Sequence, residues 1–138
     1  MLFRSSKGTN VGATVAALNG LGSNDAGKRI WLIAGGEGKG QDFSPLREPA
    51  LRFVKGVFLI GKDGEKIAQA IGGDIPCVIS GDLPTAVSAA AAQAVSGDLV
   101  LLSPACASLD QFRDYVERAQ VFVSEVEELG TRIEEAQA

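Results

Sequence analysis

The fold is decided by a short apolar run and the glycines that follow it, IWLIAGGEGKG at residues 30–40. Its first five residues are apolar without a break, whereas a strand with one solvent-exposed face would alternate apolar and polar side chains. Similar runs follow in VFLI at 57–60, CVI at 77–79 and LVLL at 99–102. Such runs are typical of strands buried on both faces of a parallel sheet.

Helix-forming patterns lie between these runs. Ser44 and Pro45 are expected to begin one helix, as its N-cap and first helical residue, and Gly56 is expected to end it. The other helices are expected over residues 11–18, 64–71, 83–95 and from 112 onward. Because strands and helices alternate along the chain, we predict an α/β fold: a Rossmann-like, mostly parallel sheet flanked by helices on both faces.

The expected strand order points to a site. In one half of a doubly wound sheet the strands lie in the order third, second, first, fourth, and ligands bind at the carboxyl ends beside the reversal. The segments that follow the first and fourth runs are the glycine-rich GGEGKG at 35–40 and the small-residue SPACAS at 103–108. This order therefore predicts that the two segments meet at one edge of the sheet.

The glycine-rich segment does not match a phosphate-binding signature. A Walker A loop requires Gly five residues before its Gly-Lys pair and Ser or Thr after it, but Ile33 and Gly40 hold those positions. The segment is not a GxGxxG dinucleotide fingerprint either. Two interpretations stay open: a flexible turn, or a loop whose backbone N–H groups and Lys39 hold a carboxylate.

The segment SKGTN at 6–10 places a lysine and hydroxyl groups just before an expected helix. Helix N-termini attract anions, so an anion site is one interpretation. Simple capping of the helix by Thr9 or Asn10 is the second, and it is the one that we favour from spacing alone.

In SPACAS and the residues after it, Ser108 and Asp110 can cap the next helix, and the small residues would let a ligand approach that helix end. Capping and an anion pocket are compatible here. A nucleophilic role for Cys106 would need a base or a helix N-terminus, and only the helix end is available. We favour Cys106 as a small buried apolar residue.

Composition excludes several classes of function. The chain of 138 residues suffices for one domain, and its net charge of −4 argues against non-specific nucleic-acid binding. No apolar run approaches the roughly 18 residues of a membrane span. The chain has no histidine, which excludes Ser–His and Cys–His catalysis and His-ligated zinc. Two cysteines make no disulfide framework, so we expect a reduced, cytoplasmic protein.

Three blocks together carry a family resemblance: SKGTNVGATVAALNGL at 6–21, GGEGKGQDFSPL at 35–46 and LLSPACASLDQFRDY at 101–115. In this order they closely resemble the C-terminal domain of the Mur ligases, above all of those that add D-glutamate to UDP-N-acetylmuramoyl-L-alanine. The resemblance implies peptidoglycan precursor synthesis, in which the amine of D-glutamate attacks an ATP-derived acyl phosphate.

The resemblance also implies substrate-binding roles. Thr9 and Lys39 would hold the α-carboxylate of D-glutamate, and Ser108 would hold the side-chain carboxylate together with the backbone of Leu109 and Tyr115. Tyr115 stands where the family more often has Phe. A substrate with two carboxylates requires two anion sites rather than a nucleophile.

The remaining implied roles concern the nucleotide. Lys7 would be a catalytic residue near the reacting phosphoryl and acyl groups. Ser5 stands where the family usually has an Asp that helps hold the adenosine part of ATP. ATP and magnesium would bind mainly to a central domain of the complete ligase, and no cofactor is expected in this chain alone.

The resemblance divides the chain into a boundary remnant at 1–5, the amino-acid-binding domain at 6–130 and a polar tail at 131–138 that should fray. The sequence contains no P-loop and no UDP-binding domain, so we expect a domain that depends on missing N-terminal and central domains and is inactive alone. A stand-alone binding module for a small dicarboxylate is the main competing hypothesis. Two further hypotheses, which we favour less, are that the chain is the nucleotide-binding half of an oxidoreductase or that it is a cysteine enzyme.

Overall fold

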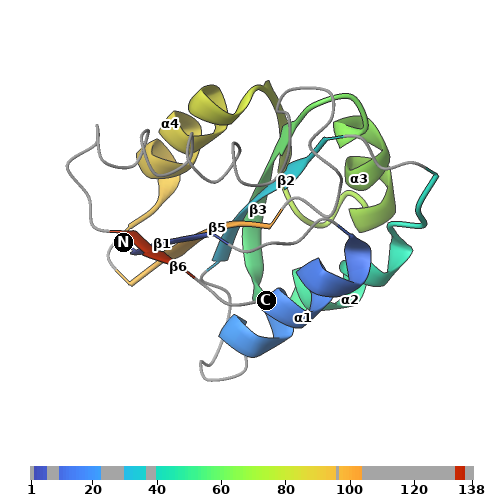
Figure 1. Cartoon of the computed structure of the whole chain (residues 1–138), viewed down its shortest axis with the longest axis horizontal. Helices are drawn as coiled ribbons and strands as arrows, with labels where there is room; N and C mark the ends of the chain where they lie inside the picture. The colour runs from blue at the N-terminus through green and yellow to red at the C-terminus, as the bar shows by residue number, and fades with distance from the viewer. Residues whose placement is uncertain are drawn as a thin grey trace.

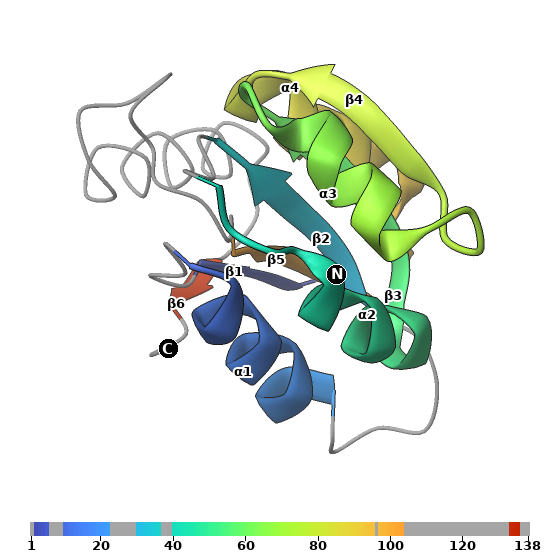
Figure 2. The same cartoon turned by 90° about the vertical axis from the view of Figure 1, so that its right-hand side faces the viewer.

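The computed structural model describes residues 2–5, 10–22, 30–36, 40–95, 97–103 and 133–135. In these residues six strands form one sheet in the order β4-β3-β2-β5-β1-β6, and every neighbouring pair is parallel (Figure 1 and Figure 2). The strands are β1 Leu2–Ser5, β2 Ile30–Gly35, β3 Val54–Ile60, β4 Cys77–Gly81, β5 Leu99–Leu102 and β6 Ile133–Glu135. The order β4-β3-β2-β5 confirms the arrangement expected for the four apolar runs.

Helices cover both faces of the sheet, as the α/β interpretation requires. They are α1 Val11–Gly22, the short 3₁₀ helix η1 Ser44–Leu46, α2 Arg47–Phe53, α3 Gly64–Ile71 and α4 Leu83–Gln93. Figure 2 shows α1, α2 and α3 on the opposite side of the sheet from α4. No helix in the described ranges is long and apolar enough to cross a membrane.

The central strands contribute to two cores, because successive side chains of a strand point to opposite faces. Leu32 of β2 and Leu101 of β5 pack with the helices α1 to α3, whereas Ile33 and Leu102, one residue further along, pack with α4. All four side chains are fully buried. Burial on both faces explains why these strands are continuously apolar in sequence.

Two short strands, β1 and β6, differ from the sequence-based expectation. They lie within the segments expected to be a boundary remnant and a fraying tail, yet β1 pairs with β5 on one side and with β6 on the other. These two strands extend the sheet expected from the four apolar runs and leave its order β4-β3-β2-β5 unchanged. The division of the chain into a domain at 6–130 and its flanks stays a prediction.

The strand β4 is predicted correctly in position but not in burial. It lies at the edge of the sheet, and Val78 and Ile79 are 48% and 57% exposed. An edge strand has a neighbour on one side only, so its apolar side chains receive less cover than those of β2 or β5. The expectation that all four apolar runs are buried on both faces is wrong for this strand.

The boundaries of α2 need correction. Its 3₁₀ start is held by Asp42, whose carboxylate accepts from the Ser44 N–H at 3.0 Å and the Ser44 hydroxyl at 2.9 Å. Ser44 is thus the first helical residue rather than the cap. Gly56 does not end the helix but lies inside β3, where a Cβ would come within 2.6 Å of the Trp31 ring. The ring occupies the space that a side chain would need.

The remaining helices agree more closely with expectation. The bounds of α3 are confirmed, α1 extends four residues past the expected 18, and α4 ends at Gln93 rather than 95. The early end of α4 has a local cause, because the Val95 N–H is bonded to the Asp98 carboxylate at 3.0 Å instead of continuing the helix. The helix expected from residue 112 lies outside the described residues.

Candidate functional site

Three strand ends lie side by side at the carboxyl edge of the sheet. In the register of the sheet Ser5 of β1 is paired with Leu102 of β5, and Leu102 is paired with Ile33 of β2. Neighbouring strands are about 4.8 Å apart, so the ends of β1 and β2 are separated by roughly 10 Å with the end of β5 between them. The predicted adjacency of the ends of β2 and β5 is confirmed.

These ends lead directly to the segments that contain the predicted site residues. Residues 6–9 follow β1, residues 37–39 follow the Gly35-Gly36 turn, and residues 104–115 follow Ser103. The predicted residues themselves, and Cys106, lie outside the described residues: Lys7, Thr9, Lys39, Ser108, Leu109 and Tyr115. The structure therefore locates where their segments begin and leaves their roles as predictions.

The turn after β2 depends on glycine. Gly35 has a φ of 134°, in the region that favours glycine, and a Cβ there would overlap the carbonyl oxygen of Ile60. The next residue is fixed on both sides, because the Gly36 N–H donates to Ile60 O at 3.0 Å and Gly36 O accepts from the Asp63 N–H at 2.9 Å. The start of the lysine-containing segment is thereby tied to the end of β3.

The N-terminus of α1 is capped by protein groups. The Ala13 N–H donates to Asn10 Oδ1 at 2.9 Å, and the Val11 N–H donates to Gln41 Oε1, also at 2.9 Å. This supports the capping interpretation of Asn10 over an anion site on these two N–H groups. Thr9, the second expected cap, lies outside the described residues.

A pair of buried hydroxyl groups joins α1 to the end of β5. Thr14 Oγ1 is 3.2 Å from Ser103 O and 3.0 Å from Ser103 Oγ, and both residues are fully buried. A hydroxyl has one proton, so if Thr14 donates to the carbonyl then Ser103 donates to Thr14. The Ser103 N–H is also used, since it donates to Ile33 O at 3.1 Å.

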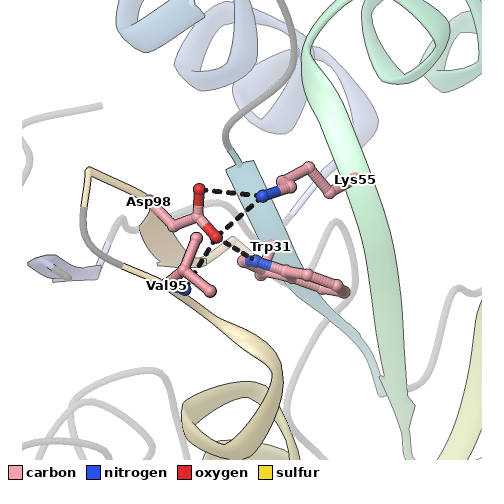
Figure 3. A network of polar contacts seen from close by, with 4 residues as sticks. All are labelled: Trp31, Lys55, Val95 and Asp98. Carbon is pink, nitrogen blue, oxygen red and sulfur yellow. Dashed lines mark hydrogen bonds and ion pairs between the residues drawn. The ribbon is translucent and has the colours of Figure 1, made fainter.

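A second polar cluster lies at the opposite edge, where β2, β3 and β5 begin (Figure 3). The Asp98 carboxylate accepts from Lys55 Nζ at 3.0 Å, from Trp31 Nε1 at 2.9 Å and from the Val95 N–H. Burial would raise the pKa of Asp98, but the bonds from Val95, Trp31 and Lys55 hold the pKa below its usual value. This cluster is far from the carboxyl edge and joins elements of the fold.

Two surface hollows also lie away from the three strand ends. One, of about 540 Å³, is lined by η1 and α2 residues that include Arg47 and Arg52. The other, of about 220 Å³, is lined by Trp31, Pro76 and Val78 among others. The Cys77 thiol next to it is half-buried, and burial raises its pKa, which disfavours the reactive thiolate. Neither hollow contains a residue that the sequence analysis assigned to the site.

Sequence reasoning assigned no individual role to three residues beside the three strand ends: Thr14, Gln41 and Ser103. One signal was present for Thr14, because it lies at helical spacing from the buried Val11 and Leu18 and therefore places a hydroxyl in an apolar stripe. A buried hydroxyl needs a partner, which could have been sought at the end of a neighbouring strand. For Gln41 the sequence contains no comparable signal.

Comparison with known proteins gives one family. The family model described as Mur ligase, glutamate ligase domain, matches residues 2–106. Among curated relatives, the UDP-N-acetylmuramoylalanine–D-glutamate ligase of Cupriavidus metallidurans is 58% identical over 128 residues, which cover 92% of this chain and 24% of the relative. The protein of the same name from Pseudomonas aeruginosa is 53% identical over 127 residues, covering 92% and 28%.

The resemblance extends to another genus. The ligase of the same name from Legionella pneumophila is 52% identical over 121 residues, covering 88% of this chain and 27% of the relative. The chain thus spans about a quarter of the length of these relatives. Since the family model matches most of the residues of the chain, the chain belongs to the Mur ligase family and contains its glutamate ligase domain.

Proposed function

We propose that this chain is the amino-acid-binding domain of an ATP-dependent ligase that adds D-glutamate to UDP-N-acetylmuramoyl-L-alanine in the cytoplasm. The observation that carries the proposal is the register that sets the ends of β1, β5 and β2 side by side. Residues 6–9, 104–110 and 37–39 continue from these ends. The names of the relatives support D-glutamate as the amino acid.

The chemistry of D-glutamate fits the residue types in these segments. Its α-carboxylate would be held by Thr9 and Lys39, and its side-chain carboxylate by Ser108 with the backbone of Leu109 and Tyr115. Hydrogen bonds to charged groups are worth roughly 1.5–3 kcal/mol each, so a few of them can orient a small dicarboxylate. Two separate carboxylate contacts fix the direction of the amine between them.

The reaction requires groups that this chain does not supply. ATP, bound with magnesium mainly by a central domain, would transfer its terminal phosphoryl group to the carboxylate of UDP-N-acetylmuramoyl-L-alanine and leave as ADP, which gives the acyl phosphate. The amino-acid-binding domain would then present the amine of D-glutamate, which forms the amide bond as phosphate leaves. Lys7 would lie near the reacting phosphoryl and acyl groups as a catalytic residue. Positioning of this kind can supply much of a rate enhancement.

A chimera tests the proposal in a complete ligase. The matching region of the Cupriavidus metallidurans enzyme is replaced by this chain, and phosphate release is measured with ATP, magnesium and UDP-N-acetylmuramoyl-L-alanine. We expect turnover that depends on D-glutamate and is not supported by L-glutamate. A folded chimera that turns over with another amino acid but not with D-glutamate would contradict the proposal.

Calorimetric titration of the 138-residue chain with D-glutamate separates the proposal from a stand-alone dicarboxylate module. A domain that needs partner domains should bind more weakly than millimolar, and it should release no phosphate when ATP and both substrates are added. Micromolar binding by the chain alone would favour the module instead.

A further inference from the structure

The first turn of α1 is linked to two segments that are distant in sequence. Thr14 bonds to Ser103, 89 residues away, and the Val11 N–H bonds to Gln41, 30 residues away. A threonine inside a helix commonly bonds back to a carbonyl of its own helix. A helix N–H is commonly satisfied by a local cap. Here both groups are used for contacts between elements.

The contact at Ser103 fixes the backbone where β5 ends. The next residue is Pro104, which has no N–H, so the peptide that joins the two residues can be held only through its carbonyl oxygen. That oxygen accepts from Thr14 Oγ1, while the Ser103 N–H donates to Ile33 O. Groups from α1 and β2 therefore hold both polar groups of the Ser103 backbone.

The contact at Gln41 acts on the glycine-rich segment. Gln41 lies two residues after Lys39, and Val11 lies two residues after Thr9. The 2.9 Å hydrogen bond from the Val11 N–H to Gln41 Oε1 therefore connects two points of the chain. Each point lies two residues past a residue, Thr9 or Lys39, that is expected to bind the α-carboxylate. The side chain of Gln41 is partly buried, so its neighbours restrict the conformations that it can adopt.

We propose that Thr14 and Gln41 are positioning residues for D-glutamate. Thr14 holds Ser103, the residue before segment 104–110, and Gln41 holds the chain just after segment 37–39. Both contacts are made to the first turn of α1, which follows segment 6–9. This inference rests on the proposed function. The physical reason is that two carboxylates must be met at once, and a small error in the spacing of two anion sites weakens both sets of hydrogen bonds. Neither side chain needs to touch the substrate.

The test is made in the chimera. Thr14→Val keeps the shape of the side chain and removes its hydroxyl group. We expect it to raise the KM for D-glutamate about fivefold or more, because the hydrogen bonds between Thr14 and Ser103 that align the site are lost. The KM for ATP should change by less than about twofold, since the nucleotide is held mainly elsewhere. Thr14→Ser, which restores the hydroxyl, should return the KM for D-glutamate to near its original value.

Two further variants keep the test decisive if Thr14→Val does not fold. Ser103→Ala leaves the carbonyl acceptor of Thr14 in place, so it should have a smaller effect in the same direction. Gln41→Met removes the acceptor for the Val11 N–H at a partly buried position and should also raise the KM for D-glutamate.

The controls separate positioning from loss of stability. Ile67→Val shortens a fully buried side chain of α3, and Thr85→Val repeats the chemical change at an exposed site on α4. Neither should change the KM for D-glutamate. If Thr14→Val and Gln41→Met fold and match these controls, the inference is wrong while the proposed function stands. If the unmodified chimera folds but shows no turnover with D-glutamate, the proposed function fails and the inference fails with it.

Discussion

Lys55 donates to both carboxylate oxygens of Asp98, each at 3.0 Å, and so joins β3 to the turn that precedes β5. The two side chains differ in exposure, with 32% of Lys55 and 6% of Asp98 accessible. Asp98 also accepts from the indole of Trp31 and from the backbone of Val95. A nearly buried carboxylate with four donor contacts is a satisfied group, and removing it would leave several donors without an acceptor.

Removal of Asp98 should therefore be costly, in contrast to removal of an exposed ion-pair partner. We expect Asp98→Ala to lower the free energy of unfolding by about 2–3 kcal/mol, because the partly buried donor groups of Lys55, Trp31 and Val95 lose their acceptor. Asp74→Ala, which breaks the exposed 3.4 Å pair with Arg47, should change the free energy of unfolding by less than about 0.5 kcal/mol. Urea unfolding followed by circular dichroism measures both. Equal effects of the two substitutions would contradict the importance given to the cluster.

The same carboxylate predicts a pH dependence. The pKa of Asp98 is held below its ordinary value despite burial, because Val95, Trp31 and Lys55 stabilise the charged form. A depressed pKa in the folded state gives stability that is present above the unfolded value of about 3.9 and is lost as pH falls through the folded pKa. The free energy of unfolding of the unmodified chain should exceed that of Asp98→Asn, and this difference should shrink as pH falls from about 6 to below 3. A constant difference across this range would rule out the mechanism.

Two glycine substitutions should change the free energy of unfolding in opposite directions. Gly35→Ala places a methyl group against Ile60 O at a φ of 134°, so we expect the free energy of unfolding to fall by about 2 kcal/mol or more. Gly20→Ala lies in α1 with nothing within 4 Å of the new Cβ, and we expect a gain of about 0.5–1 kcal/mol from helix propensity. Thermal unfolding of both variants checks the contrast. A neutral Gly35→Ala would mean that the turn after β2 rearranges freely.

The sequence allowed much of the central sheet to be predicted, and the reason is burial. Strands β2, β3 and β5 have helices on both faces, so unbroken apolar runs identified them. The four-residue β1 and the three-residue β6 contain charged residues and have no such run. Strands β1 and β6 pair although they lie far apart in sequence, so no local sequence pattern predicts their pairing.

Rules based on single residue types failed where a specific side-chain contact decided the geometry. Gly56 resembled a helix terminator, but it is a strand residue without a Cβ because Trp31 packs on it. The helix α4 was expected to continue to 95, but Asp98 takes the N–H of Val95. At the candidate site the strand ends could be predicted from topology, whereas Thr14, Gln41 and Ser103 depend on contacts between elements that spacing does not reveal.

Lys39 is the positively charged residue of segment 37–39, which follows β2 and the Gly35-Gly36 turn. In the chimera, Lys39→Ala should raise the KM for D-glutamate by about tenfold or more, because a charge-assisted hydrogen bond to the α-carboxylate is lost. The KM for ATP should change much less. Lys62→Ala is the matched control, since this exposed lysine follows the carboxyl end of the neighbouring strand β3 and preserves Lys39 while removing the same charge. Steady-state kinetics with each substrate varied in turn measures both constants. An unchanged KM for D-glutamate would remove Lys39 from the site, and equal effects of the two substitutions would attribute the change to net charge at this edge rather than to one contact.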